Sequence, residues 1–206
     1  MVMKILLFSR EETVAGEHEQ INQMFEMGLK FFHLRKPKLN RARYELALQG
    51  VKPEFRKRVV IHSHFGLLRK YNIGGIHLTE RFKKHPLRMK RLIKRIHSIR
   101  GKFRISITCH SLKELVTLDK DFAYATLSPI FDSLSKKGYT SQFDMKDVKD
   151  SILKSETKVV ALGGCDATKL KAIESMGFWG TGLLGAIWNQ PDPVQAYQEF
   201  TRQIKE

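Results

Sequence analysis

Short hydrophobic runs, often β-branched, alternate along the chain with longer stretches in which hydrophobic residues recur at helical spacing. The short runs predict eight strands, at residues 3–8, 29–35, 58–62, 75–78, 104–108, 122–127, the first part of 158–166, and 180–184. The longer stretches predict a helical segment after each strand, at residues 17–27, 40–49, 67–71, 86–99, 111–118, 144–153, 166–176 and from 192 onward.

Strands that alternate with helices indicate a parallel sheet with right-handed crossovers. Eight such units close into a barrel, so the sequence predicts an α/β fold with a single small (β/α)8 TIM barrel domain over residues 1–206. An open doubly wound sheet is the alternative. It is less favoured because no glycine-rich turn follows the first strand.

The composition is typical of a soluble globular protein, with 42% hydrophobic and 28% charged residues. No hydrophobic run approaches the length of about 20 residues that spans a membrane. The N-terminal run is too short for a signal peptide, and the two cysteines fit a reducing compartment. These features predict a cytoplasmic protein without a membrane partner.

The chain is strongly basic, with a formal net charge of +16. Residues 81–104 are rich in Lys and Arg and contain no acid. A basic field attracts phosphorylated metabolites, nucleic acid and acidic surfaces alike, and the simplest interpretation is a solvated helix face. Phe82 and Phe103 are the only aromatic residues among these charges, so few rings are present on which nucleic-acid bases could stack. Nucleic acid is therefore an unlikely partner.

Active sites of such barrels lie at the C-terminal ends of the strands. Histidines occupy several of these ends, at His33, His62, His64, His77 and His110. We expect His77, within a hydrophobic strand, to be a core histidine with a hydrogen-bond partner. Histidines gathered at one rim can also bind a metal. The spacing offers only the pair at positions 62 and 64, and we predict no metal site.

A second feature of the predicted rim is a pair of glycines, Gly163 and Gly164, between the seventh strand and a helix. Glycine lets a phosphate approach the backbone N–H groups closely. Gly185 and Ala186 end the eighth strand beside it. We therefore predict an anion site at these two strand ends, although a tight Gly-Gly connection is the simpler alternative.

With these residues placed, the chain resembles the thiamine phosphate synthase and TenI family of small (β/α)8 barrels over nearly its whole length. The matching segments are FHLRK at 32–36, VIHS at 60–63, GIHL at 75–78, SITCHSL at 106–112, SPIF at 128–131 with a serine-lysine loop after it, VALGG at 160–164 and LGAI at 184–187.

The synthase of this family joins hydroxymethylpyrimidine pyrophosphate to thiazole phosphate and releases pyrophosphate. The resemblance implies a thiazole phosphate site at Gly163, Gly164, Gly185 and Ala186. It implies contacts to the pyrophosphate or a second ligand from His33, Arg35, Thr108, Ser133, Ser135 and Lys136.

The sequence departs from the synthase pattern where magnesium binds. Synthases have Asn-Asp after strand three, where this chain has His62-Ser63, and Phe82 replaces a further acidic residue after strand four. Magnesium prefers hard oxygen ligands, usually carboxylates. We therefore expect no cofactor, magnesium being compatible only with a synthase that uses other ligands such as Glu80.

The second branch of the family, the TenI-type thiazole tautomerases, aromatises thiazole phosphate without magnesium. We favour this activity, with a synthase and a catalytically inactive thiazole phosphate-binding or regulatory protein as alternatives. The histidine that tautomerases use on strand six corresponds to Pro129, so His62 or His110, together with Arg35, are the candidate catalytic residues. The expected partner is a phosphorylated small molecule. Assembly into a homo-oligomer is compatible with the sequence.

Overall fold

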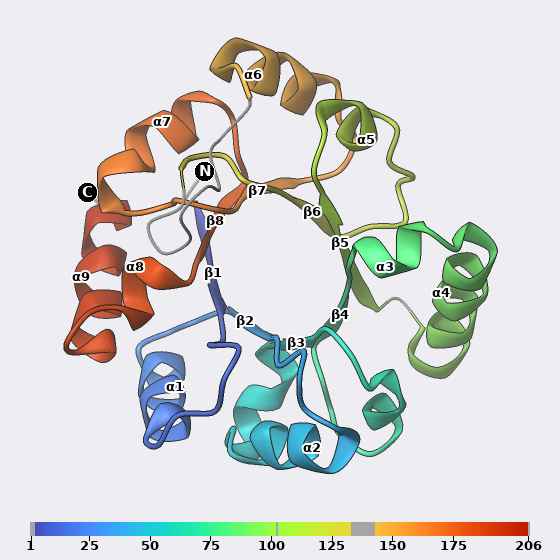
Figure 1. Ribbon diagram of the computed structural model, residues 1–206, viewed down its shortest axis with the longest axis vertical. Coiled ribbons are helices and arrows are strands. Elements are labelled where there is room, and N and C mark those ends of the chain that lie inside the picture. Colours follow the sequence, from blue (N-terminus) through green and yellow to red (C-terminus); the bar gives the residue numbers. More distant parts are fainter. Residues whose placement is uncertain (1–2, 102, 133–142, 206) are drawn as a thin grey trace.

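The computed structural model describes residues 3–101, 103–132 and 143–205, and it contains a closed barrel of eight parallel strands in sequence order. The strands are β1 (Lys4–Phe8), β2 (Phe31–Leu34), β3 (Val59–Ile61), β4 (Gly75–Leu78), β5 (Arg104–Cys109), β6 (Tyr124–Leu127), β7 (Val159–Ala161) and β8 (Gly180–Leu183). β8 pairs with β1 and closes the ring, which Figure 1 shows from one end with the helices outside it. The predicted (β/α)8 barrel is confirmed, and the open sheet is excluded.

The helices lie around the barrel in chain order (Figure 1). The α-helices are α1 (Glu17–Glu26), α2 (Arg41–Gln49), α3 (Glu80–Lys83), α4 (Pro86–Arg100), α5 (Leu112–Val116), α6 (Met145–Lys154), α7 (Leu170–Ser175), α8 (Gly185–Trp188) and α9 (Pro193–Lys205). Three 3₁₀ helices join them, η1 (Pro53–Arg58), η2 (Phe65–Arg69) and η3 (Ala167–Lys169). The helix expected at 67–71 is thus a 3₁₀ segment, and η3 forms the first turn of the helix expected at 166–176.

Side-chain caps explain where several helices begin. The Asn40 carboxamide accepts from the Arg43 N–H at the start of α2, and the Ser111 hydroxyl accepts from the Glu114 N–H at the start of α5. Glu114 reaches back to accept from the His110 N–H, one residue before the Ser111 cap, so the contact resembles a capping box shifted by one residue. The last cap also holds His110, a residue of the rim, against the start of α5.

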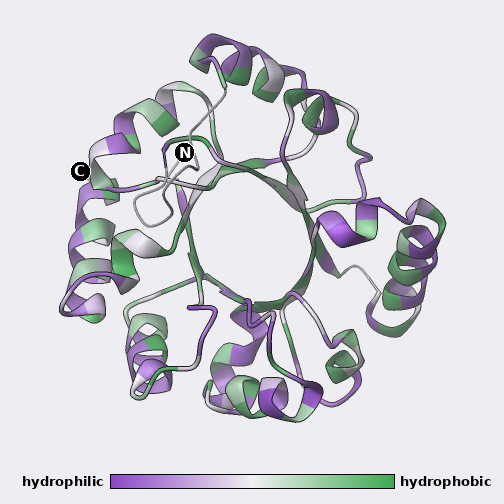
Figure 2. Ribbon diagram, in the orientation of Figure 1, coloured by the Kyte–Doolittle hydropathy of each residue, from purple (hydrophilic) through white to green (hydrophobic). Residues whose placement is uncertain are grey.

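Two hydrophobic cores hold the barrel. The larger one lies between the strands and the helices, and the smaller one fills the barrel interior with Leu6, Phe8, Tyr124 and Val160. Figure 2 shows hydrophobic residues along much of the ring of strands, whereas the helices outside it carry both hydrophobic and hydrophilic residues. Side chains alternate between these two cores along each strand, because successive residues point to opposite faces of a sheet.

The register of β2, β3 and β4 determines which polar side chains enter the barrel. His33 pairs with Val60, and Val60 pairs with Gly75. His62 comes two residues after Val60, and His77 two residues after Gly75. Since side chains alternate along a strand, both face the same side as His33. They lie one inward-facing position nearer the C-terminal ends of the strands than His33 does. Three histidines from adjacent strands therefore enter one interior.

Cys109 and Cys165 are buried and unpaired with each other. Burial raises the pKa of each thiol to about 12, so both stay protonated at neutral pH. Over the described part of the chain, no helix is both long and apolar enough to cross a membrane.

Candidate active site at the C-terminal rim

A cavity of about 380 Å³ opens at the C-terminal ends of the strands, and residues that follow or end all eight strands line it. Most of the residues predicted from the sequence lie on its wall. They are Arg35, His62, Thr108, His110, Gly163, Gly164, Gly185 and Ala186. The barrel thus brings together groups that are up to about 150 positions apart, as parallel strands with aligned C-terminal ends require.

The Gly163–Gly164 turn has a backbone that only glycine adopts easily, with φ of +90° and +64°. A Cβ on Gly164 would lie 2.7 Å from the Phe131 carbonyl carbon and would overlap the Asp132 carbonyl oxygen. The Phe131 N–H donates to the Gly163 carbonyl, which packs the turn against the segment after β6. Within the described residues, neither glycine N–H donates a hydrogen bond, so both remain available to an anion.

Gly185 and Ala186 stand beside this turn but belong to α8, because β8 ends at Leu183. Their expected place at the end of the eighth strand is therefore corrected by two to three residues. The run of apolar residues to Ile187 continues through the short helix, where Ile187 and Trp188 are buried. Both residues still line the cavity.

Arg35 lies on the β2 side of the cavity, where its guanidinium forms an ion pair with Glu11. Its backbone is fixed by Ser9, whose hydroxyl donates to the Arg35 carbonyl and accepts from the Arg35 N–H at 3.0 and 2.9 Å. The positive group is thus held at the rim by the segment that follows β1.

His110 is exposed at the rim, after β5. Its Nδ1 lies 2.9 Å from the Ser128 carbonyl oxygen. A carbonyl only accepts, so Nδ1 carries a proton, and in the neutral ring the lone pair is on Nε2. The ring is therefore oriented with a proton-accepting nitrogen available to a ligand.

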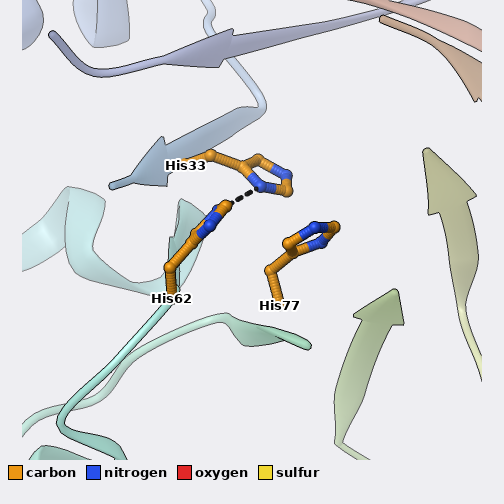
Figure 3. A group of neighbouring side chains, drawn as sticks. All are labelled: His33, His62 and His77. Atoms are coloured by element: carbon orange, nitrogen blue, oxygen red, sulfur yellow. Dashed lines mark hydrogen bonds between the residues drawn. The ribbon is translucent and has the colours of Figure 1, made fainter. Parts of the chain in front are cut away.

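The floor of the cavity is formed by His62 and His77, with His33 below them. Figure 3 shows the three rings turned toward one another from neighbouring strands. His33 Nδ1 lies 3.0 Å from His62 Nε2, and His33 Nε2 lies 2.7 Å from the Tyr124 hydroxyl. Phe8 stacks on the His33 ring with 4.4 Å between centroids.

Burial keeps these rings neutral. It lowers the pKa of His33 and His62 well below the usual value, with a further contribution from the charge that His77 would carry. Burial, with Arg35 nearby, lowers the pKa of His77 to about 3. The three imidazoles thus have lone pairs at neutral pH, and none is positioned to exchange protons as a free histidine does.

Two expectations for individual histidines need correction, and a third is confirmed and extended. His33 has 0% exposure and lies beneath the cavity, so it does not reach a ligand as a pyrophosphate-binding residue would. His64 does not pair with His62, because its backbone has a positive φ of 52° and its Nε2 bonds the Leu39 carbonyl. His77 is a hydrogen-bonded core histidine, as expected, but it also lines the cavity. Ser133, Ser135 and Lys136 lie outside the described residues.

Sequence reasoning missed Glu11, Thr79 and Cys165, which also line the cavity. Glu11 lies in the segment after β1, where no periodic pattern indicates a direction. Its position three residues after the end of β1, and so near the rim, was the one available signal.

The residues present fit magnesium poorly. Two carboxylates line the cavity, Glu11 and Glu80. Each already faces a cation, since Glu11 pairs with Arg35 and Glu80 lies 2.7 Å from Lys83. Phe82, in the place of the family's acidic residue, packs against Phe65 instead. A hard dication that needs several oxygen ligands would have to displace both ion pairs.

These features define a (β/α)8 barrel with a glycine-lined cavity at the C-terminal ends of its strands. The sequence profile of the family described as thiamine monophosphate synthase matches residues 5–187. The protein belongs to this family, as the resemblance in the sequence implies.

Individual relatives agree with the family. A thiamine-phosphate synthase of Caldicellulosiruptor saccharolyticus is 25% identical over 193 residues, which cover 91% of this chain and 84% of the relative. A putative thiamine-phosphate synthase 2 of Aquifex aeolicus is 26% identical over 166 residues, which cover 79% of this chain and 84% of the relative.

Solved structures show the same architecture. A thiamine phosphate pyrophosphorylase of Bacteroides thetaiotaomicron superposes with a TM-score of 0.77 at 26% identity, over 98% of this chain and 96% of that one. The corresponding protein of Pyrococcus furiosus gives the same TM-score of 0.77 at 14% identity, which supports the fold alone.

Proposed function

We propose that the protein is a magnesium-independent, TenI-type enzyme of thiamine biosynthesis that binds a thiazole phosphate at the barrel rim and moves a proton on its ring. The contact between His110 Nδ1 and the Ser128 carbonyl is the observation that carries the proposal. It places an imidazole directly beside Pro129, the position at which the tautomerases of the family carry their histidine.

The phosphate is assigned to the wall made by the glycine turn and the start of α8. Gly163 and Gly164 offer N–H groups without acceptors in the described part of the chain, and Gly185 and Ala186 lie next to them on the cavity wall. Hydrogen bonds from N–H groups to a charged acceptor are among the stronger ones, at about 1.5–3 kcal/mol each. This wall is separate from the histidine floor, so the phosphate end and the ring end of a substrate have different partners.

His110 then serves as the proton carrier. With Nδ1–H held by the Ser128 carbonyl, Nε2 accepts a proton from the bound ring and returns it at another atom, so no net proton is gained or lost. His62, the other candidate, is buried and bonded to His33, which leaves it poorly suited to this exchange. Arg35, paired with Glu11, balances negative charge at the same mouth.

The test measures aromatisation of thiazole phosphate by the wild-type protein and by His110→Gln. We expect the substitution to lower turnover about 100-fold or more, the usual contribution of a general acid–base group, while the dissociation constant for thiazole phosphate stays within about threefold. His85→Gln, at an exposed site before α4, is the matched control and should leave turnover unchanged. Turnover that survives in His110→Gln contradicts the assignment.

Synthase activity is the second candidate, and two observations favour it. Pro129 is the synthase-like residue at the end of strand six, and the relatives named above are called thiamine-phosphate synthases. A synthase would have to bind hydroxymethylpyrimidine pyrophosphate, so formation of thiamine phosphate separates the two activities. Binding of thiazole phosphate without turnover in either assay would instead identify a protein that has lost its chemistry.

A further inference from the structure

Three histidine side chains meet inside the barrel. One ring nitrogen from each of His33, His62 and His77 lies within 4.8 Å of the others. The centroid of the His33 ring is 5.2 Å from that of His62 and 5.3 Å from that of His77. The His62 and His77 centroids are 4.5 Å apart. Figure 3 shows the rings facing a common centre.

The hydrogen bonds of His77 determine which nitrogen is free. The Ser106 hydroxyl donates to the Ile76 carbonyl at 3.2 Å, which uses its single proton. Ser106 therefore accepts from His77, whose Nδ1 lies 2.9 Å from the hydroxyl oxygen. His77 is thus protonated on Nδ1, and its Nε2 has a free lone pair.

His33 offers the same arrangement. Its Nε2 lies 2.7 Å from the Tyr124 hydroxyl, whose oxygen can accept a hydrogen bond from the ring N–H. Nδ1 then has the lone pair and lies 3.0 Å from His62 Nε2. His62 Nδ1 is buried and has no hydrogen-bond partner in the described part of the chain, so a bond between His33 and His62 alone leaves that ring incompletely satisfied.

The ring centroids, 4.5, 5.2 and 5.3 Å apart, have the spacing found around a metal ion, and the ring nitrogens, within 4.8 Å of one another, would draw together on binding. Zinc binds imidazole nitrogen at about 2.0–2.1 Å, which in a tetrahedral site places two ligand nitrogens about 3.4 Å apart and two ring centres about 5 Å apart. Histidines that ligate a metal usually donate their other N–H to a carboxylate, a backbone carbonyl or water, and a hydroxyl oxygen can accept in the same way. Ser106 and Tyr124 supply this second contact for His77 and His33.

We propose that His33, His62 and His77 form a binding site for a transition-metal dication of the zinc class, with three imidazole ligands and a fourth position toward the cavity. Imidazole ligands favour Zn²⁺, Co²⁺, Ni²⁺ or Cu²⁺ over Mg²⁺, which favours oxygen. His62 and His77 line the cavity floor, so the ion has a path from solvent. The site uses none of the residues assigned to the phosphate or to the proton carrier, and it stands whether or not the proposed function does.

The competing explanation is a metal-free hydrogen-bonded cluster that only fills the barrel. It predicts no stoichiometric metal, and it predicts that loss of the Tyr124 hydroxyl changes stability alone. The metal site predicts that the same loss weakens metal binding, because removal of a contact to a ligating histidine typically costs 10- to 100-fold in affinity.

The experiment loads full-length, tag-free protein with Zn²⁺ or Co²⁺ after chelator treatment. Elemental mass spectrometry gives the bound metal per chain, and competition with a chelator gives the affinity. The visible spectrum of the Co²⁺ form reports the coordination geometry. We expect one metal per chain and the intense visible absorption of tetrahedral cobalt. The thermal midpoint should rise with added Zn²⁺, because the metal binds the folded state.

Three variants complete the test. His77→Gln should lose stoichiometric metal and the cobalt spectrum. Tyr124→Phe, which keeps the ring and removes only the hydroxyl, should bind metal at least tenfold more weakly. His85→Gln removes an exposed histidine and should bind as the wild type does.

The Tyr124→Phe result decides the matter even if His77→Gln does not fold. A wild-type protein that binds far less than one metal per chain overturns the proposal. An equal loss of bound metal in His85→Gln and His77→Gln also overturns it, since it would indicate adventitious surface binding. An unchanged metal affinity in Tyr124→Phe overturns it because the metal would then not depend on the contact to His33.

Discussion

Substitution of Gly164 by alanine probes the turn on which the proposed phosphate site depends. Gly164 has a φ of +64°, and its added Cβ would lie 2.7 Å from the Phe131 carbonyl carbon and from the Phe131 Cβ. The matched control is Gly16→Ala, at a φ of +75° with no atom within 4 Å of the added Cβ. Both variants place alanine at a positive φ, and only the first adds a collision at the cavity.

The two contributions can be estimated separately. A left-handed conformation costs a non-glycine residue about 1–2 kcal/mol. Overpacking against neighbours adds about 1–3 kcal/mol at Gly164. The free energy of unfolding should therefore fall by about 3 kcal/mol in Gly164→Ala and by about 1.5 kcal/mol in Gly16→Ala. For a domain of this size these values correspond to losses of about 6–12 °C and about 3–6 °C in the thermal midpoint.

Binding responds differently. The Phe131–Asp132 backbone cannot accommodate the new methyl group without movement of the turn, which misdirects the N–H groups of Gly163 and Gly164. Loss of one N–H contact to a phosphate, at about 1.5 kcal/mol or more, weakens binding at least tenfold. Gly16, which precedes α1, is outside the cavity lining, so its variant should bind normally.

Calorimetric titration with thiazole phosphate, at a temperature where both variants are folded, measures the difference. The reasoning is refuted if Gly164→Ala binds as the wild type does, or if Gly16→Ala loses the same affinity. A fall in stability with unchanged affinity in Gly164→Ala would restrict the turn to a structural role.

Three further predictions concern stability and charge. The pKa of His77 is about 3 when folded and about 6.5 when unfolded, so the unfolded chain binds more protons between these values and stability falls as the pH decreases through that window. In chelator, urea unfolding should show a pH slope about 1.4 kcal/mol per unit smaller in His77→Gln than in the wild type from pH 6 to 4.5, and equal slopes would argue against a buried neutral ring. Glu17 and Lys36 form an ion pair in which each side chain has only 1% exposure, so Glu17→Gln should cost about 3 kcal/mol in chemical denaturation, whereas Glu17→Leu with Lys36→Met should cost less. Replacing Lys90, Lys94 and Arg95 on the basic helix α4 by glutamine should slow substrate association and flatten its salt dependence, and a large loss of turnover at saturating substrate would contradict this steering role.

The sequence predicted the barrel well because each strand is a buried run between clear helix signals. Val59–Ile61 and Val159–Ala161 are short, yet every residue of both strands is buried and β-branched or small. Boundaries were less certain where apolar residues continue from a strand into a helix, as at Leu184 to Ile187. There, local hydrophobicity does not distinguish the two states.

The sequence predicted most residues of the site, but not how far below the rim each of them lies. A period of two shows that His33, His62 and His77 share the inner face, but only the register between β2, β3 and β4 places the first below the other two. Contacts between distant loops were equally hidden, since nothing near Glu11 or Arg35 in the sequence indicates that they pair. The bond between His110 and Ser128 likewise arises only because β5 and β6 are neighbours in the barrel.

The most direct test of the proposed activity supplies thiazole phosphate and hydroxymethylpyrimidine pyrophosphate together, with and without Mg²⁺, and follows thiamine phosphate and the aromatic thiazole product. A TenI-type enzyme gives aromatisation that is unchanged by magnesium and no thiamine phosphate above the background. Rapid, magnesium-dependent formation of thiamine phosphate would contradict the account and identify a synthase.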